Sequence, residues 1–409
     1  MKTDILIIGG GAAGMMCAVQ SAWAGHEVIV LEHEKKPCQK LNITGKGRCN
    51  VTNNCDVRTV IANTPRGGKF LYSALSRFTP EDTMAFFESL GIELKTERGN
   101  RVFPVSDKAF DISGALINAA KEAGVRIVRD EARSLIIEGG AVRGVYGREG
   151  EYLAQRVVVA CGGLSYPKTG STGGGYKLAR QAGHTVTECV GSLVPVEMYG
   201  SECREAMGLS LKNCGLTVRD NVSEKTVFSD MGEMLFTHFG MSGPLVLSAS
   251  AHLHDIEKGR YTFTIDFKPA LDEKKLGERI LRDFSEIPNR DFDNSLGRLL
   301  PASIIPVIVK RSGISPAKKV NQITREERLR LIACIKGFTL EVRGLRPVEE
   351  AIITRGGVAT DELSPKTLES KLVSGLHFIG EVIDADAYTG GFNLQIAWAT
   401  AYAAATSFT

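Results

Sequence analysis

The first thirty-two residues carry the most regular pattern of apolar and small residues in the chain. A continuous apolar run, Ile5–Ile8, precedes three glycines in the spacing Gly-x-Gly-x-x-Gly, which are Gly9, Gly11 and Gly14. A helical pattern follows, and a second apolar run, Val28–Leu31, leads to Glu32. Short apolar runs bounded by glycine indicate buried parallel strands. The order of strand, glycine turn, helix and strand therefore predicts a dinucleotide-binding βαβ unit.

Each part of this unit has a predicted role. The first glycine permits a tight turn, the second lets the backbone approach a pyrophosphate, and the third lets the helix pack closely on the strand. The pyrophosphate accepts hydrogen bonds from free N–H groups at the helix N-terminus, where Ala12 and Ala13 stand. Glu32 can accept hydrogen bonds from an adenosine ribose, and its charge repels a 2′-phosphate. FAD or NAD is therefore expected here, and NADP is not.

The C-terminal segment shows a second motif of the same kind. An apolar strand over residues 375–381 contains Gly380 and Glu381, with Asp384 close behind. A glycine-rich turn then opens an alanine-rich helix that runs to about residue 405, and its predicted cofactor contacts are Gly390, Gly391, Phe392, Asn393 and Leu394. An acid for the ribityl hydroxyls and a helix N-terminus with its partial positive charge suit a flavin. The two ends of the chain together favour FAD over NAD.

Between these motifs the pattern predicts further helices and strands. Helices are expected over 80–90, with Thr79 as N-cap, and over 112–123, with Asp111 as N-cap. Strands at 126–129, 132–138 and 141–146 are expected to form a β-meander. The apolar run at 156–159 predicts a buried parallel strand, followed by contacts on the adenosine side of FAD at Ala160, Gly162 and Gly163.

Residues 191–350 differ in kind, because strands are followed by helices instead of alternating with them. We predict an α/β chain with a discontinuous FAD-binding, Rossmann-like domain of the glutathione-reductase type over 1–190 and 351–409. The insert, 191–350, is expected to be β-rich and barrel-like over 191–270 and about 338–350. Its small helical part, 271–337, includes a predicted helix over 296–310. No second Gly-x-Gly-x-x-Gly occurs, so a separate NAD(P)H-binding Rossmann domain is not expected.

Composition narrows the classes of function. At 409 residues with 43% hydrophobic residues, the chain is long enough for two or three domains with a sizeable core. It has no apolar run long enough to cross a bilayer, and no signal peptide precedes the first strand, so a cytoplasmic location is expected. The nine cysteines lack zinc-site spacing. They are expected to be reduced thiols, with no metal site.

The small net charge of +3 hides two basic segments. Residues 35–69 carry eight Lys and Arg against one Asp, and residues 310–330 carry seven against two Glu. Such segments can be solvated helix faces, or they can form an electropositive surface for cofactor phosphates or nucleic acid. The residues alone leave both interpretations open.

Five blocks resemble a family of bacterial flavoproteins described as BaiN-like, YhiN-like or aminoacetone-oxidase-like. They are residues 40–53, 160–176, 235–244, 356–363 and 378–404. The resemblance implies a discontinuous FAD domain with a β-barrel-like insert and a helical insert. It also implies cofactor contacts from the first block, at Lys40, Gly45, Lys46, Gly47, Arg48, Cys49 and Asn50. Lys46 departs from the family pattern, in which many members have glycine.

Reduction of an activated double bond needs a hydride from the flavin and a proton from an acid. Cys49 is one candidate acid, and Arg48 beside it is expected to lower the pKa of its thiol. His238 is the second candidate, because a Gly-Met-Ser-Gly-Pro loop after it indicates a substrate-facing turn. Arg48 could also hold a carbonyl oxygen of the flavin or of the substrate.

The resemblance implies several activities. Members are associated with reducing double bonds in bile-acid intermediates, with reducing uridine in ribosomal RNA, or with oxidising aminoacetone. We expect a reductase of a small substrate whose C=C bond is conjugated to a carbonyl, with NADH or NADPH as transient reductant. The alternatives are a ribosomal RNA uridine reductase that binds through the two basic segments, an aminoacetone oxidase, and a non-catalytic redox sensor. No membrane or metal partner is expected.

Overall fold

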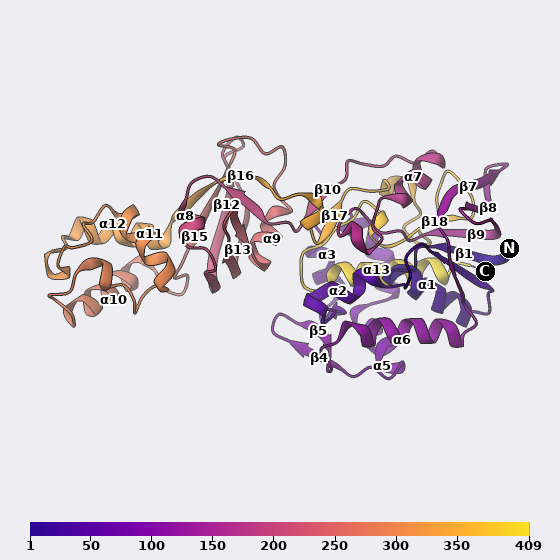
Figure 1. The fold of residues 1–409 in the computed structure, drawn as a ribbon, viewed down its shortest axis with the longest axis horizontal. Helices are drawn as coiled ribbons and strands as arrows, with labels where there is room; N and C mark the ends of the chain where they lie inside the picture. The colour runs from indigo at the N-terminus through magenta and orange to yellow at the C-terminus, as the bar shows by residue number, and fades with distance from the viewer. Residues whose placement is uncertain (409) are drawn as a thin grey trace. The chain divides into compact units, whose positions relative to one another are not determined.

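The structure is a computed structural model that describes residues 1–408, and the chain divides into two compact units. The first unit joins Met1–Ser192 to the C-terminal segment that starts at Val348, and the second unit is Leu193–Pro347. The colours of Figure 1 follow the chain out of the first unit and back into it. The first unit is therefore discontinuous in sequence.

A seven-stranded sheet lies at the centre of the first unit. Its order is β6–β2–β1–β9–β8–β7, and β18 also pairs with β9. The strands are β1 (Lys2–Ile8), β2 (Val28–Glu32), β6 (Arg126–Arg129), β7 (Ala132–Glu138), β8 (Ala141–Gly147), β9 (Glu151–Val159) and β18 (Leu376–Phe378). β1 is parallel to both β2 and β9, so the carboxyl ends of these three strands meet at one edge.

One predicted strand belongs to a different part of the sheet. Residues 126–129 form β6, which is parallel to β2 and not part of the meander. The antiparallel strands are β7, β8 and β9. The reason is that helix α6 (Ala109–Glu122) precedes β6, and a helical crossover returns the chain to a parallel position.

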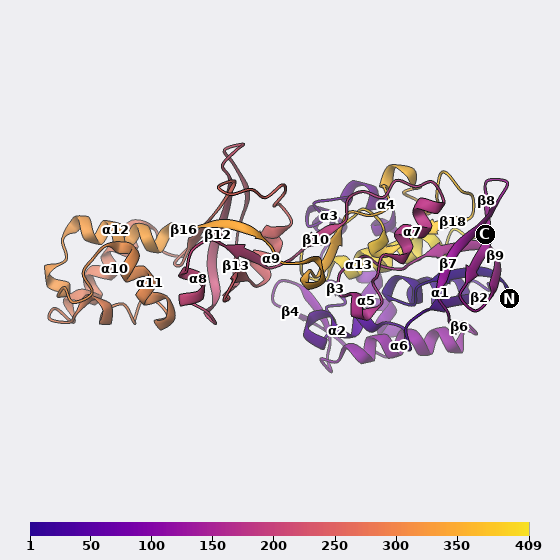
Figure 2. The same cartoon turned by 45° about the horizontal axis from the view of Figure 1, so that its top comes forward.

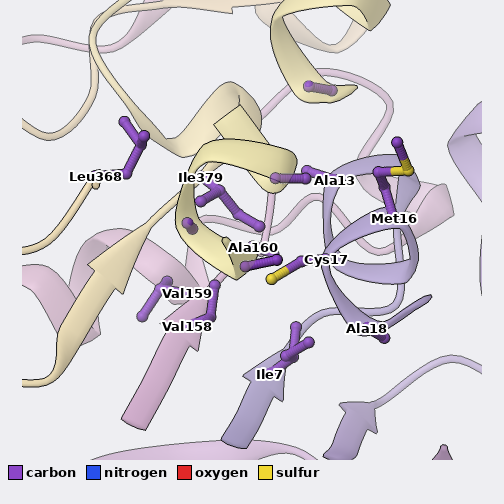
Figure 3. Packing of buried hydrophobic residues seen from close by; sticks show 14 of the residues in the cluster. Ile7, Ala13, Met16, Cys17, Ala18, Val158, Val159, Ala160, Leu368 and Ile379 are labelled. Carbon is purple, nitrogen blue, oxygen red and sulfur yellow. The ribbon is translucent and has the colours of Figure 1, made fainter. Parts of the chain in front are cut away.

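Two helices from opposite ends of the chain pack together in the first unit. They are α1 (Ala12–Trp23) and α13 (Phe392–Ala405). Figure 3 shows the side chain of Cys17, on α1, close to Ala160, which follows β9. A Cβ atom on Gly14 would lie 1.9 Å from the carbonyl oxygen of Gly9, so α1 can lie this close to the turn only because residue 14 has no side chain.

The other elements of the first unit surround this core. The helices are α2 (Gln39–Gly47), α3 (Val57–Ala62), α4 (Gly68–Arg77), α5 (Pro80–Ser89) and α7 (Gly174–Gln181). The short strands are β3 (Thr52–Asn53), β4 (Leu94–Glu97), β5 (Arg101–Pro104), β10 (Val190–Ser192) and β17 (Ile353–Arg355). Thr79 caps α5 as predicted, in a capping box with Asp82.

Helix α6 begins earlier than the sequence pattern predicts. Its N-cap is Lys108, so the predicted Asp111 cap is wrong. Asp111 lies in the first turn instead, where a negative charge interacts favourably with the helix dipole. The apolar periodicity had placed the start too late because Ala109 is buried while the next residue, Phe110, is exposed.

The second unit contains a closed barrel in the order β11–β14–β13–β12–β15–β16, whose larger strands are labelled in Figure 2. The strands are β11 (Val196–Met198), β12 (Ser210–Asp220), β13 (Lys225–Phe236), β14 (Gly240–Ser242), β15 (Tyr261–Asp266) and β16 (Phe338–Leu345). The helices are α8 (Glu202–Glu205), α9 (Pro244–Ser250), α10 (Glu273–Ser285), α11 (Ile305–Ser312) and α12 (Arg325–Lys336). The predicted fold class, a Rossmann-like fold with a barrel and a helical part inserted, is confirmed.

The predicted helix over 296–310 is wrong in its first half. Pro301 has no backbone N–H and disfavours helical geometry in the residue before it, and a short 3-10 turn, Ala302–Ile304, follows. The helix α11 starts only at Ile305, with Pro306 in its first turn, where proline is tolerated. Within residues 1–408, no helix has both the length and the apolar character that crossing a membrane requires.

Candidate active site

A cavity in the first unit opens where three parallel strands end. Its wall includes Ile8 at the end of β1, Glu32 at the end of β2, and Ala160 just after β9. Glu381 and Asn393 of the C-terminal motif line the same cavity. Ligands of open α/β sheets bind at the carboxyl ends of the strands. The N-terminal and C-terminal motifs therefore face one common site.

The three glycines of the N-terminal motif differ in what surrounds them. A Cβ atom on Gly9 would lie 2.6 Å from the carbonyl oxygen of Ala160, and a Cβ atom on Gly14 would be more crowded still, 1.9 Å from the carbonyl oxygen of Gly9. A Cβ atom on Gly11 would meet nothing within 4 Å, and Gly11 lines the cavity. No side chain caps the N-terminus of α1, so its first N–H groups remain available to an anion. The space beside Gly11 is where a pyrophosphate could accept those hydrogen bonds.

Glu32 is held in the wall of the cavity by backbone donors. Its carboxylate accepts a hydrogen bond from the N–H of Gly10 and another from the N–H of Glu34, each 2.8 Å long. An ionised carboxylate has about four lone-pair sites, so it can accept ribose hydroxyls as well. The side chain is thus fixed in position before any ligand binds.

A polar cluster lies at the other motif. Lys40 donates hydrogen bonds to the Glu381 carboxylate at 2.7 Å and to the Ser165 hydroxyl at 2.6 Å. The second Glu381 oxygen accepts from the Ser165 hydroxyl at 3.0 Å and from the N–H of Thr354 at 2.9 Å. Sequence reasoning missed Ser165 and Thr354. Ser165 lies inside a block that resembles the flavoprotein family, but no spacing rule marks it, and no motif contains Thr354.

The N-terminus of α13 is shaped by Asn393. Its side-chain amide donates to the carbonyl of Ala387 at 2.7 Å, and its amide oxygen accepts from the N–H of the same residue at 2.9 Å. Gly391 precedes the helix, and a Cβ atom there would lie 2.4 Å from the carbonyl group of Thr52. This turn therefore fixes where the helix starts, and Asn393 and Leu394 reach the cavity wall.

Half of the predicted cofactor contacts line this cavity. They are Gly9, Gly11, Ala12, Ala13, Glu32, Lys40, Ala160, Gly162, Gly380, Glu381, Asn393 and Leu394. The others lie outside its wall: Gly14, Gly45, Lys46, Gly47, Arg48, Cys49, Asn50, Gly163, Asp384, Gly390, Gly391 and Phe392. Asp384 is paired with Arg66, and the side-chain oxygen of Asn50 is buried with no hydrogen-bond partner among residues 1–408.

Arg48 and Cys49 have surroundings that the sequence did not predict. The Arg48 guanidinium makes ion pairs with Glu97 and Asp107, each at 2.5 Å. The Cys49 side chain is completely buried, and burial raises the pKa of its thiol to about 12. The prediction that Arg48 lowers this pKa is therefore wrong, because two carboxylates neutralise the guanidinium and desolvation dominates at the thiol.

The other predicted proton donor belongs to the second unit. His238 lies in the turn between β13 and β14, its side chain is exposed, and it lines a cavity formed by second-unit residues. The two candidate donors are thus on different units of the chain. In the described part of the chain, residues 1–408, no three His, Cys, Asp or Glu side chains are grouped to hold a metal ion.

The residues around the first cavity fit FAD. The open space at Gly11, the uncapped end of α1 and the fixed Glu32 carboxylate suit the adenosine diphosphate part. The fold and this site define an FAD-dependent oxidoreductase of the Rossmann type. Residues 3–407 match the family described as "HI0933-like protein Rossmann domain", and the chain belongs to that family.

Curated relatives match almost the whole chain. It is 32% identical to a 3-dehydro-bile acid delta(4,6)-reductase of Clostridium scindens, over 97% of each chain. It is also 32% identical to a ribosomal RNA dihydrouridine synthase of Escherichia coli, over 99% of this chain and 97% of that one. A solved 3-ketosteroid delta1-dehydrogenase from Sterolibacterium denitrificans has a similar fold, with a TM-score of 0.52, 15% identity, and coverage of 100% of this chain and 99% of that one.

Proposed function

We propose that this protein is an FAD-dependent reductase that saturates a carbon–carbon double bond conjugated to a carbonyl, with NADH or NADPH as electron donor. The observation that carries the proposal is that relatives with two different substrates match the chain equally well. A delta(4,6) double bond beside a 3-oxo group and the ring double bond of uracil are both conjugated to a carbonyl. The change of bond is therefore what the two relatives have in common.

In this proposal each motif holds one part of FAD, which supplies the hydride when bound. The N-terminus of α1 and the space at Gly11 hold the pyrophosphate, and Glu32 holds the adenosine ribose. Glu381, oriented by Lys40, accepts hydrogen bonds from the ribityl hydroxyls. The N-terminus of α13 adds partial positive charge near the flavin ring.

Of the two candidate proton donors we favour His238. A general acid must come within hydrogen-bond reach of the carbon or oxygen that it protonates. His238 has an exposed side chain, whereas Cys49 is completely buried and its raised pKa makes it a weak acid. Imidazole is also the side chain most often used for proton transfer near neutral pH.

We propose a small conjugated ketone or acid as the first candidate substrate. The second basic segment offers less free charge than its sequence suggests, because four of its seven cations are ion-paired inside the second unit. These pairs are Lys310–Glu205, Arg311–Glu202, Lys318–Glu327 and Lys319–Asp291. Uridine in ribosomal RNA is the second candidate, which the dihydrouridine synthase relatives favour.

The test is a pair of anaerobic half-reactions followed by flavin absorbance. The FAD-loaded protein is reduced with NADH or NADPH and then mixed with a steroid acid whose double bond is conjugated to its ketone, with a ribosomal RNA fragment, or with buffer. We expect one of the two substrates to reoxidise the flavin and to gain two hydrogens. Aminoacetone is the control for the opposite reaction, in which the substrate is oxidised and the flavin is reduced. If it reduces the oxidised protein and neither unsaturated substrate reoxidises the reduced protein, the proposal is wrong.

A further inference from the structure

The cavity on the second unit has an unusual concentration of arginine. Its volume is about 320 Å³, and its charged lining residues are Arg204, Arg343, Arg346 and Glu197. His238 lines it too, and buried Met198 and Cys203 complete part of its wall. Three guanidinium groups therefore face one carboxylate. A cleft lined by charges of one sign concentrates its field on a ligand of the opposite sign.

The three guanidiniums are not equivalent. Arg346 donates to the Glu197 carboxylate at 3.0 Å and stacks 4.7 Å above the ring of Phe239, so its position is fixed. Residues 1–408 provide neither an ion pair nor a hydrogen bond to the guanidinium of Arg204 or of Arg343. The cavity thus combines one anchored arginine with two that have unused donors.

The local backbone explains how Arg343 comes to line this wall. Glu197 pairs with Gly344, and the next residue of β11, Met198, pairs with Val342, so Arg343 is the extra residue of a β-bulge in β16. Bulges bend a strand and redirect a side chain, and they are frequent beside functional sites. The strand here departs from regular pairing at the residue whose charge lines the cavity.

Neighbouring acidic residues do not neutralise Arg204. Two glutamates share the short helix α8 with it, and both are engaged elsewhere. Glu202 lies 3.6 Å from Arg311, and Glu205 lies 3.8 Å from Lys310. Two cations of the second basic segment therefore neutralise the glutamates of α8, and the charge of Arg204 stays available to a ligand in the cavity.

We propose that this cavity is a binding site for a phosphate group. A carboxylate has two oxygens and is satisfied by one bidentate arginine, whereas a phosphate offers three or four oxygens to several guanidiniums. Two sources carry this group: the 2′-phosphate of NADPH and the backbone of RNA. Binding of RNA and its competition by pyrophosphate can be measured without turnover, so the inference goes beyond the proposed reductase activity and can be tested separately from it.

The test compares two double variants of the FAD-loaded full chain. Arg204→Gln with Arg343→Gln removes the two free guanidiniums of the cavity. The matched control, Lys212→Gln with Arg219→Gln, removes two exposed charges of β12 that do not line it. The probes are a fluorescein-labelled single-stranded RNA, followed by anisotropy, and NADPH compared with NADH, followed by flavin reduction. The salt concentration is held constant because polyanion binding depends steeply on it.

We expect the cavity variant to weaken binding at least tenfold, since each charge-assisted hydrogen bond is worth about that factor or more. If the cavity variant binds RNA more weakly, the ligand is a polynucleotide. If it binds NADPH more weakly and NADH as well as before, the ligand is the electron donor. If both probes lose no more than in the control, the proposal is overturned. A measurement on the unaltered protein gives a second test: inorganic pyrophosphate should displace one probe more strongly than chloride at equal ionic strength, and equal displacement would also overturn it.

Discussion

Gly11→Ala should weaken FAD binding and leave the stability of the fold nearly unchanged, whereas Gly14→Ala should destabilise the fold. A Cβ atom at position 14 would lie 1.9 Å from the backbone oxygen of Gly9, which cannot move without moving the strand. Gly14→Ala should therefore lower the free energy of unfolding by about 1–3 kcal/mol or more. Gly11 has a φ of −77° in extended geometry and open space around it. There the weaker N-cap preference of alanine and the stiffer unfolded chain act in opposite directions, so stability should change by less than about 1 kcal/mol.

FAD affinity, in contrast to stability, should fall in Gly11→Ala. The methyl group added by Gly11→Ala fills the space that the pyrophosphate needs. A forced displacement costs about 1–3 kcal/mol, which corresponds to a roughly 5- to 150-fold weaker FAD affinity. Urea unfolding of the apoprotein and FAD titration by flavin fluorescence measure the two quantities separately. Wild-type FAD affinity in Gly11→Ala, or an apoprotein of undiminished stability in Gly14→Ala, would refute this reasoning.

Three further predictions concern single side chains. Asp386 is buried, burial raises its pKa to about 6, and one of its oxygens lacks a partner among residues 1–408. The ordinary pKa of an aspartate is about 3.9, so the free energy of unfolding of the wild-type protein should be highest below that pH and should fall as the pH rises through 6. Asp386→Asn should remove this fall and raise the free energy of unfolding by up to about 3 kcal/mol at pH 7, as measured by urea unfolding. A lower free energy of unfolding in the variant at pH 7 would contradict this prediction. In stopped-flow mixing, His238→Gln should slow the reoxidation of the flavin by substrate by roughly 10²–10⁴-fold, whereas Cys49→Ala should slow it less than about tenfold. A larger effect of Cys49→Ala than of His238→Gln would favour the thiol as proton donor. Lys46 has a φ of 61°, so Lys46→Gly should raise the free energy of unfolding by up to about 1 kcal/mol, and a decrease in chemical denaturation would show that its side chain is stabilising.

The sequence predicted those parts of the fold that depend on local spacing. The strand, glycine turn and helix at Gly9–Gly14, the capping box at Thr79 and the C-terminal helix all follow from residues close together in the chain. The misplaced start of α6 and the broken helix before Ile305 show the limit of periodicity. An exposed aromatic residue interrupted one pattern, and proline interrupted the other.

The site was less predictable because it depends on contacts between distant segments. The cluster of Lys40, Ser165, Thr354 and Glu381 joins four separate parts of the chain, and no spacing within any of them reveals it. The pKa of Cys49 follows from burial, which its charged neighbour in sequence does not indicate. The arginine cavity depends on a β-bulge, which the sequence around residue 343 does not predict.

The central claim is that the protein adds two hydrogens across a double bond conjugated to a carbonyl. Its most direct test uses FAD-loaded protein that is photoreduced in D₂O with EDTA as the electron donor, without oxygen and without NAD(P)H, and then mixed with the steroid acid or the ribosomal RNA fragment. Mass spectrometry of the products should show that one of them gains two deuterium atoms across that bond as the flavin is reoxidised. Unchanged masses for both, with the flavin still reduced until oxygen is admitted, would contradict the claim.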